Sequence, residues 1–120
     1  MARILLAEDD SSLRGFLTRA LERAGHQVVD CENGDDAIDA LEPGPYDLLL
    51  TDIVMPGMDG IEVARLAAAK QPGLRIMFIT GFAAVALAAG ESAPPGAKVL
   101  SKPIHLREIV SEVERMMAAA

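Results

Sequence analysis

Residues 47–60 read DLLLTDIVMPGMDG. The apolar run at residues 48–50 has no polar alternation, which is typical of a strand buried on both faces of a parallel sheet. The run ends in a carboxylate, Asp52, and Asp59 can cap a helix that begins at Gly60. This stretch therefore predicts a strand, an acidic loop and a helix, which is the repeating unit of an α/β fold.

The same unit repeats along the chain. Apolar runs predict strands at residues 4–7, 27–29, 47–51, 75–79 and 98–100. The first, third and fourth runs lack polar alternation, so we expect them in the middle of the sheet. Right-handed crossovers between such strands give a doubly wound, open parallel sheet.

Helical periodicity separates the predicted strands. Ser11 or Ser12 can cap a first helix, and further helices are expected at residues 36–41, at residues 60–70 and after Pro103. An apolar stripe on the first and the last helix predicts the face that packs on the sheet. These stripes are Leu13, Phe16, Leu17, Ala20, Leu21 and Ala24 in the first helix, and Leu106, Ile109, Val110, Val113 and Met117 in the last.

The composition limits the classes of function. With 120 residues, 51% of them hydrophobic, the chain suits one domain over residues 1–120 with no attached output domain. A net charge of -7 and an aromatic content of 3% argue against nucleic-acid binding. No apolar run approaches the ~20 residues that span a bilayer, and Cys31 cannot form an intrachain disulfide. We therefore expect a cytoplasmic protein that does not insert into membranes.

Polar side chains follow four of the predicted strands. Glu8 and Asp9 follow the first strand and Asp52 the third. Thr80 and Lys102 come at the ends of the fourth and fifth. Because the carboxyl ends of parallel strands meet at one edge of the sheet, we expect these five side chains to converge there.

The converging groups predict phosphoryl chemistry. Three carboxylates placed together repel one another unless a cation binds among them, and oxygen ligands favour Mg²⁺. Beside such a cation, Asp52 can act as a nucleophile toward a phosphoryl group, while Thr80 and Lys102 can bind the phosphoryl oxygens. The expected product is an aspartyl phosphate on Asp52.

Four segments carry a family resemblance. ILLAEDD (4–10), LTDIVMPGMDG (50–60), ITG (79–81) and LSKP (100–103) occur in the order and spacing of a response-regulator receiver domain of bacterial two-component signalling, which the chain resembles over its whole length. The resemblance implies a flavodoxin-like, CheY-like three-layer sandwich with strand order 2-1-3-4-5 and five helices.

The resemblance also implies roles for the residues at the sheet edge. Asp52 accepts phosphate from a phosphohistidine protein, while Glu8, Asp9, Asp52 and the Val54 main-chain carbonyl hold Mg²⁺. Thr80 and Lys102 contact the phosphoryl group, and the bond before Pro103 is cis. Such a protein is not an enzyme beyond weak Mg²⁺-dependent self-phosphorylation and autodephosphorylation.

Two further segments narrow the resemblance. FITGFAAVAL (78–87) and KVLSKPIHLRE (98–108) are similar to single-domain cell-cycle regulators of alphaproteobacteria. This implies a histidine kinase or histidine phosphotransferase of the CckA and ChpT type as phosphodonor. It also implies that the unphosphorylated form acts as an adaptor of the ClpXP protease by binding its ClpX unfoldase. Protease substrates are then further partners, and the protein is recruited to a cell pole. The partner surface is expected at Phe82, Val85, Leu87, Val99 and His105.

Other functions are open or disfavoured. The chain could instead relay phosphate from Asp52 to another histidine protein, or regulate a different target. A haloacid-dehalogenase type hydrolase needs a second aspartate two residues after the nucleophile, where this chain has Val54. A dinucleotide enzyme needs glycines where residues 8–13 read EDDSSL.

Departures from the family pattern predict differences in switching. Val99 stands where receivers commonly have an aromatic residue, so we expect any change of state to involve residues 81–96, predicted to form a short helix within 83–89 and an irregular loop. Val54 and Phe82 cannot orient water by hydrogen bonding, which predicts a long-lived acyl phosphate. The remaining polar residues are predicted to have structural or solvated positions: His26, His105, Cys31, Asp35, Asp36 and Asp39.

Overall fold

The computed structural model describes residues 2–42, 44–81, 96–102 and 105–118. In chain order its elements are β1 (Arg3–Ala7), α1 (Ser11–Arg23), β2 (Gln27–Cys31), α2 (Gly34–Ala40), β3 (Leu48–Asp52), α3 (Gly60–Lys70), β4 (Arg75–Thr80), β5 (Lys98–Ser101) and α5 (Leu106–Ala118). The strands pair in parallel in the order β2-β1-β3-β4-β5. This confirms the predicted doubly wound sheet.

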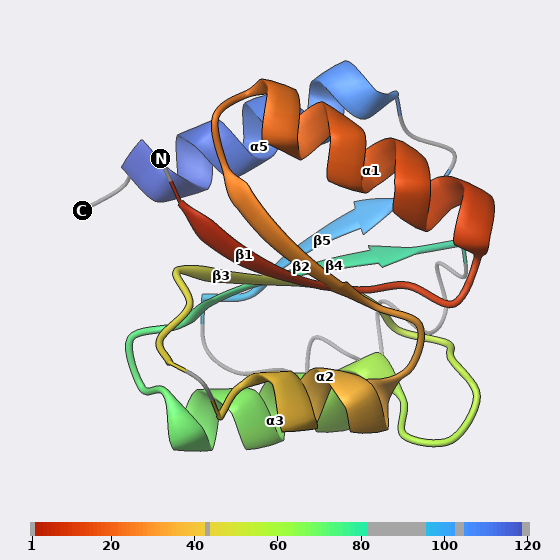
Figure 1. Cartoon of the computed structure of the whole chain (residues 1–120), viewed down its shortest axis with the longest axis vertical. Helices are drawn as coiled ribbons and strands as arrows, with labels where there is room; N and C mark the ends of the chain where they lie inside the picture. The colour runs from red at the N-terminus through yellow and green to blue at the C-terminus, as the bar shows by residue number, and fades with distance from the viewer. Residues whose placement is uncertain (1, 43, 82–95, 103–104, 119–120) are drawn as a thin grey trace.

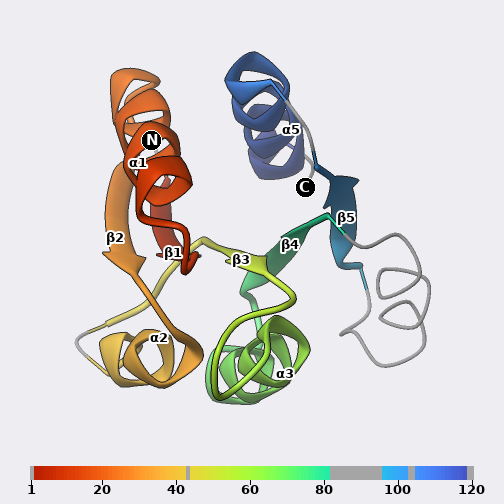
Figure 2. The same ribbon diagram turned by 90° about the vertical axis from the view of Figure 1, so that its right-hand side faces the viewer.

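The helices form a layer on each face of the sheet. Helices α1 and α5 cover one face, and α2 and α3 cover the other (Figures 1 and 2). The arrangement is the predicted three-layer sandwich. The helix predicted within residues 83–89 lies outside the described residues, so four of the five expected helices are seen.

The central strands are buried on both faces, as their unbroken apolar runs predict. All five residues of β3 are buried, and Leu48, Leu49 and Leu50 have no exposed surface. Alternate side chains of β3 enter the two core clusters on opposite faces of the sheet. Replacing Leu50 with alanine would cost about 2–5 kcal/mol in the free energy of unfolding.

The start of α1 differs from the sequence prediction. Asp10, and not Ser11 or Ser12, caps this helix, because its Oδ1 accepts the backbone N–H groups of Ser12 at 3.0 Å and Leu13 at 3.1 Å. The helix consequently begins at Ser11, directly after the acidic turn that follows β1.

The buried stripe of α1 is narrower than predicted. Leu17 and Leu21 are buried, but Phe16 is 51% exposed and Ala24 is also exposed. The Arg19 guanidinium lies 5.2 Å from the centre of the Phe16 ring, so the exposed ring contacts a neighbour on its own helix and is not buried against the sheet. The predicted stripe of α5 is confirmed, with Ile109 and Val113 buried and the others packed against them.

The other helix boundaries follow their caps. Asp59 caps α3 as predicted, accepting the Glu62 N–H at 2.9 Å. Helix α2 begins two residues earlier than expected because Asn33 caps it, accepting the Asp36 N–H at 2.8 Å.

Among the described helices, none combines the length and the apolar character that crossing a membrane requires.

Candidate functional site

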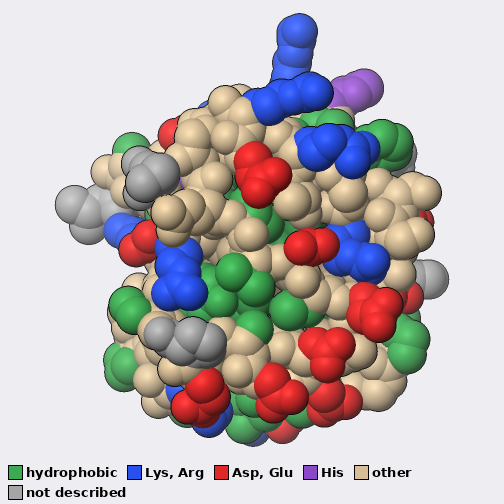
Figure 3. Space-filling model, in the orientation of Figure 1, with side chains coloured by type: hydrophobic (Ala, Val, Ile, Leu, Met, Phe, Trp, Pro, Cys, Tyr) green, Lys and Arg blue, Asp and Glu red, His purple; other side chains and the backbone are tan. Residues whose placement is uncertain are grey.

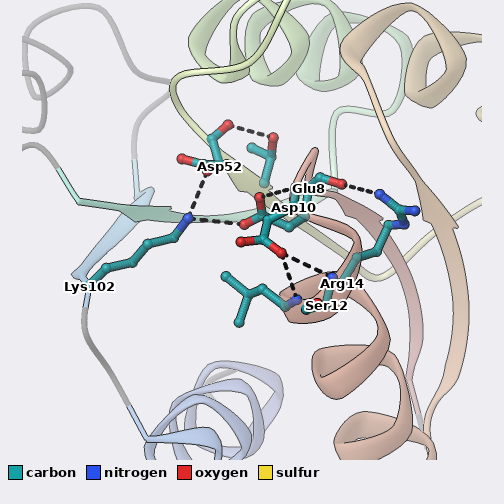
Figure 4. A network of polar contacts seen from close by, with 8 residues as sticks. Glu8, Asp10, Ser12, Arg14, Asp52 and Lys102 are labelled. Carbon is teal, nitrogen blue, oxygen red and sulfur yellow. Dashed lines mark hydrogen bonds and ion pairs between the residues drawn. The ribbon is translucent and has the colours of Figure 1, made fainter.

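Four strands bring polar side chains to one edge of the sheet. Glu8 and Asp9 follow β1, Asp52 is the last residue of β3, Thr80 is the last residue of β4, and Lys102 follows β5. The ladders β1–β3, β3–β4 and β4–β5 hold these strand ends next to one another. Figure 4 shows Glu8, Asp52 and Lys102 pointing toward a common centre.

Three carboxylates form the acidic part of the site. Oxygen atoms of Glu8, Asp9 and Asp52 all lie within 4.8 Å of one another. Glu8 and Asp52 are buried, whereas Asp9 is exposed. A carboxylate oxygen set with one side open to solvent suits a hard divalent cation that keeps some of its water, and Mg²⁺ fits this description.

Lys102 provides the positive charge at the centre of the site. Its Nζ lies 2.8 Å from Asp52 Oδ2 and 3.2 Å from Glu8 Oε1. Burial on its own lowers the pKa of Lys102, but the hydrogen bond to Asp52 and the charges of Glu8 and Asp52 outweigh burial and raise this pKa above 10.5. The ammonium group is therefore charged at neutral pH.

Both oxygen atoms of the Glu8 carboxylate accept hydrogen bonds. Oε1 accepts from Lys102, and Oε2 accepts the Asp10 N–H at 3.0 Å. Burial raises the pKa of Glu8 above 4.5, and the Asp52 charge adds to this, although the Asp10 N–H and Lys102 act in the opposite direction. The Glu8 carboxylate is thus costly to keep ionised unless a cation binds beside it.

The loop between β3 and α3 lies against Asp52. Gly60 leaves no space for a side chain, because a Cβ atom there would collide with the Asp52 main-chain oxygen. The Gly60 N–H donates to the Ile53 carbonyl at 2.8 Å, which keeps the loop tightly closed. Val54, two residues after Asp52, is 48% exposed.

Thr80 occupies the end of β4. The residue is fully buried, and its main-chain oxygen accepts the Lys102 N–H at 2.6 Å. This bond ties the end of β4 to the residue that carries the ammonium group. Thr80 and Lys102 are thus fixed to each other through the backbone.

The predicted partner surface is only partly described. Val99 lies opposite Phe78 in the sheet ladder and packs half-buried against the core, whereas His105 is exposed before α5. Phe82, Val85 and Leu87 lie outside the described residues, as does the predicted cis bond before Pro103.

Two residues that contact the main chain of the site were missed by the sequence analysis. Arg14 Nη1 donates to the Glu8 main-chain oxygen at 2.8 Å, and Thr51 Oγ1 donates to the Asp52 main-chain oxygen at 2.8 Å. The available signal for Arg14 was its place one helical turn after Asp10, which puts it on the side of α1 above the end of β1.

The residues predicted to be structural or solvated behave as expected. His26 is buried, and Cys31 packs partly buried against the core, where burial raises the pKa of its thiol to about 11. The acidic face of α2 is solvated, with Asp35, Asp36 and Asp39 exposed. In the view of Figure 3, Asp and Glu side chains lie along the lower part of the molecule, over α2, and Lys and Arg side chains lie near the top, over α1 and the start of α5.

Comparison with known proteins defines the class. A family model described as the response regulator receiver domain matches residues 4–114, and the chain belongs to this family. The family consists of signalling regulators, which are generally not true enzymes, and its members take part in two-component phosphotransfer.

Individual relatives narrow the likeness. The chain is 60% identical over 120 residues, the whole of both chains, to the response regulator receiver protein CpdR of Brucella abortus (strain 2308). It is 31% identical over 118 residues to the sensor kinase CckA of the same strain, of which it spans 12%. A crystal structure of a response regulator receiver protein from Sinorhizobium medicae WSM419 superposes with a TM-score of 0.88 at 32% identity, covering 98% of this chain and 94% of that one.

Proposed function

We propose that this chain is a phosphorylation-controlled receiver that accepts a phosphoryl group on Asp52. The observation that carries the proposal is the placement of the Asp52 carboxylate, 2.8 Å from the Lys102 ammonium and within 4.8 Å, oxygen to oxygen, of Glu8 and Asp9. A nucleophilic carboxylate surrounded by a cation and by ligands for a second cation is suited to an incoming anion.

The chain's own groups divide the work of the transfer. An Asp52 carboxylate oxygen attacks the phosphorus of a phosphohistidine, so that a P–O bond forms as the P–N bond breaks and the imidazole leaves with the electron pair. The Lys102 ammonium and the Thr80 hydroxyl bind two of the phosphoryl oxygens. Mg²⁺, held by Glu8, Asp9, Asp52 and the Val54 main-chain carbonyl, would offset the negative charge gathered there.

The phosphodonor is proposed to be a histidine kinase or histidine phosphotransferase of the CckA and ChpT type. The support is the 31% identity with the sensor kinase CckA, together with an open cleft of about 400 Å³ between α1 and α5. Leu13, Phe16 and Ile109 line this cleft, and Lys102 lines it as well, so the cleft borders the site. A helix that carries the phosphohistidine can dock on this apolar surface beside Asp52.

Intact-protein mass spectrometry tests the phosphorylation. The whole chain is incubated with acetyl phosphate and Mg²⁺, and we expect a mass increase of one phosphoryl group that disappears with a chelator and in Asp52→Asn. Asp59→Asn is the matched control, since Asp59 is an exposed helix cap, and it should be labelled normally. Failure of the wild type to gain mass, or full labelling of Asp52→Asn, would contradict the proposal.

The output is proposed to be regulated proteolysis in the cell cycle. The 60% identity with CpdR over the whole of both chains supports an adaptor role in which the unphosphorylated protein binds the ClpX unfoldase of ClpXP and prepares selected substrates. Phosphorylation of Asp52 ends this binding.

Binding to purified ClpX tests the adaptor role. We expect the unphosphorylated chain to bind, the acetyl-phosphate-treated chain to be released, and Asp52→Ala to stay bound under both conditions. Absence of binding by both proteins under both conditions removes the adaptor role. If the phosphorylated chain instead passes its phosphate to a histidine phosphotransferase, it is a relay intermediate.

A further inference from the structure

Arg14 joins three elements behind the acidic turn. From α1, its Nη1 donates to the main-chain oxygen of Glu8 at 2.8 Å, and its Nε lies 3.5 Å from Asp30 Oδ2 in β2. The Arg14 side chain is 18% exposed, so most of it is shielded from water. In Figure 4, Arg14 and Lys102 approach Glu8 from opposite sides, Arg14 at its main chain and Lys102 at its carboxylate.

The turn around Asp9 is fixed by its neighbours. The Glu8 N–H donates to the Cys31 carbonyl at 3.0 Å, the Glu8 carboxylate accepts the Asp10 N–H, and the Asp10 carboxylate caps α1. Within the described parts of the chain, no hydrogen bond or ion pair holds the Asp9 carboxylate itself. Its direction therefore depends on the backbone on either side of it.

The peptide group between Glu8 and Asp9 is the part of that backbone that Arg14 controls. A peptide is planar, so fixing its carbonyl oxygen also fixes the N–H and the Cα atom of the next residue. The bond from Arg14 to the Glu8 oxygen therefore sets where the Asp9 side chain starts. A charge-assisted hydrogen bond of this kind resists rotation more strongly than a neutral one.

We propose that Arg14 is a positioning residue, which fixes the Glu8–Asp9 peptide and so directs the Asp9 carboxylate toward the divalent cation. This inference rests on the proposed function, because it concerns how the same site binds Mg²⁺. Groups that orient metal ligands from behind typically change metal affinity by about 10–100-fold when they are removed.

The direction of the change in Mg²⁺ affinity distinguishes a positioning role of Arg14 from a purely electrostatic one. Removing a cation from the neighbourhood of a Mg²⁺ site relieves repulsion, so electrostatics on its own predicts tighter binding in an Arg14 variant. Positioning predicts weaker binding in the same variant. A general loss of stability changes the melting temperature and leaves the affinity of the folded chain unchanged.

Titration calorimetry of the whole chain with Mg²⁺, checked with Mn²⁺ by electron paramagnetic resonance, tests the role. Arg14→Met keeps the apolar stem and removes the donors, and we expect about tenfold weaker binding. Arg14→Lys, which keeps one ammonium donor, should recover part of this loss. Arg19→Met, at an exposed position on the same helix, and Asp30→Asn, which leaves the bond to Glu8 intact, should bind as the wild type does.

Each outcome decides between the alternatives. Wild-type or tighter affinity in folded Arg14→Met overturns the positioning role, as does an equal loss of affinity in Arg19→Met. Arg14→Gln removes the same guanidinium and decides the question if Arg14→Met does not fold, as judged by circular dichroism. If the wild-type chain itself binds no Mg²⁺, the proposed function fails first, and that result is separate from a failure confined to Arg14.

Discussion

The two ends of the sheet use polar groups in different ways. At the amino ends of the strands, buried or half-buried polar groups meet partners of complementary hydrogen-bonding character. His26 accepts the Ala2 N–H at 3.1 Å and lies 3.0 Å from Glu114 Oε1. Gln71 similarly accepts the Tyr46 N–H at 2.8 Å and donates to the Gly44 carbonyl at 3.1 Å.

At the carboxyl ends of the strands, the charged groups do not balance one another. The carboxylates of Glu8, Asp9 and Asp52 gather around the ammonium of Lys102, which leaves negative charge in excess. Such crowding costs stability in the absence of a cation. The amino end is thus arranged for folding, whereas the carboxyl end keeps an unfavourable charge that a cation and a phosphoryl group can use.

Removing a hydrogen-bonding side chain at the amino ends of the strands should lower the stability of the fold without changing the phosphorylation of Asp52. His26→Ala leaves the Ala2 N–H and the Glu114 carboxylate without this partner, so we expect the free energy of unfolding to fall by about 1–3 kcal/mol. Urea denaturation measures the loss, and acetyl phosphate labelling should proceed at the wild-type rate. His105→Ala, at an exposed position, is the control and should lose almost nothing. Slowed labelling in folded His26→Ala would show that the two ends are coupled.

A change beside Asp52 should affect the lifetime of the product. Val54 is 48% exposed, and its apolar side chain cannot orient an attacking water, whereas the amide of Val54→Asn can. We expect the acyl phosphate to decay several-fold faster in Val54→Asn, measured as loss of the phosphoryl mass over time. Val54→Leu stays apolar and should decay at the wild-type rate. Equal lifetimes in all three proteins would remove the water-orientation explanation.

Removing one charge from the carboxyl end should leave the fold almost as stable as before. Asp52→Asn loses the ion pair with Lys102 but relieves repulsion with Glu8 and Asp9, and Glu8 remains 3.2 Å from the ammonium. These effects offset, so we expect the free energy of unfolding without Mg²⁺ to stay within about 1 kcal/mol of the wild type. A loss as large as that of His26→Ala would contradict the contrast between the two ends.

The pH dependence of folding stability also reports the cost of the charge at the carboxyl ends of the strands. Because burial raises the pKa of Glu8 above 4.5, the folded chain holds the proton more tightly than the unfolded chain does. The contribution of Glu8 to stability is thus fully present below pH 4.5 and is lost as the pH rises through the raised pKa. Without Mg²⁺, urea midpoints of the wild type should fall relative to Glu8→Gln over this interval. Parallel pH profiles would show that Glu8 carries no such cost.

Much of the architecture could be predicted from the sequence, because it depends on local patterns. Unbroken apolar runs identified the central strands, and the rule that parallel strands end at one edge placed Glu8, Asp52 and Lys102 together. The family motifs added the strand order, which periodicity does not determine.

The errors concern interactions that local patterns do not resolve. Asp10, Ser11 and Ser12 can all cap a helix, and only the backbone geometry selects Asp10. Phe16 lies at the edge of a helical stripe, where its ring can either pack against the sheet or lie at the surface beside Arg19. The contact between Arg14 and the Glu8 carbonyl depends on how α1 packs over β1, so the spacing from Asp10 indicates the side of α1 on which Arg14 lies but not the group that it binds.

Chemical trapping of the acyl phosphate identifies the residue that accepts the phosphoryl group. The chain is treated with acetyl phosphate and Mg²⁺ and then with borohydride, which reduces a phosphorylated aspartate to homoserine, and its peptides are sequenced by mass spectrometry. We expect homoserine at position 52, formed only when Mg²⁺ is present. Homoserine at another aspartate, or equal conversion in the presence of a chelator, would contradict Mg²⁺-dependent phosphorylation of Asp52.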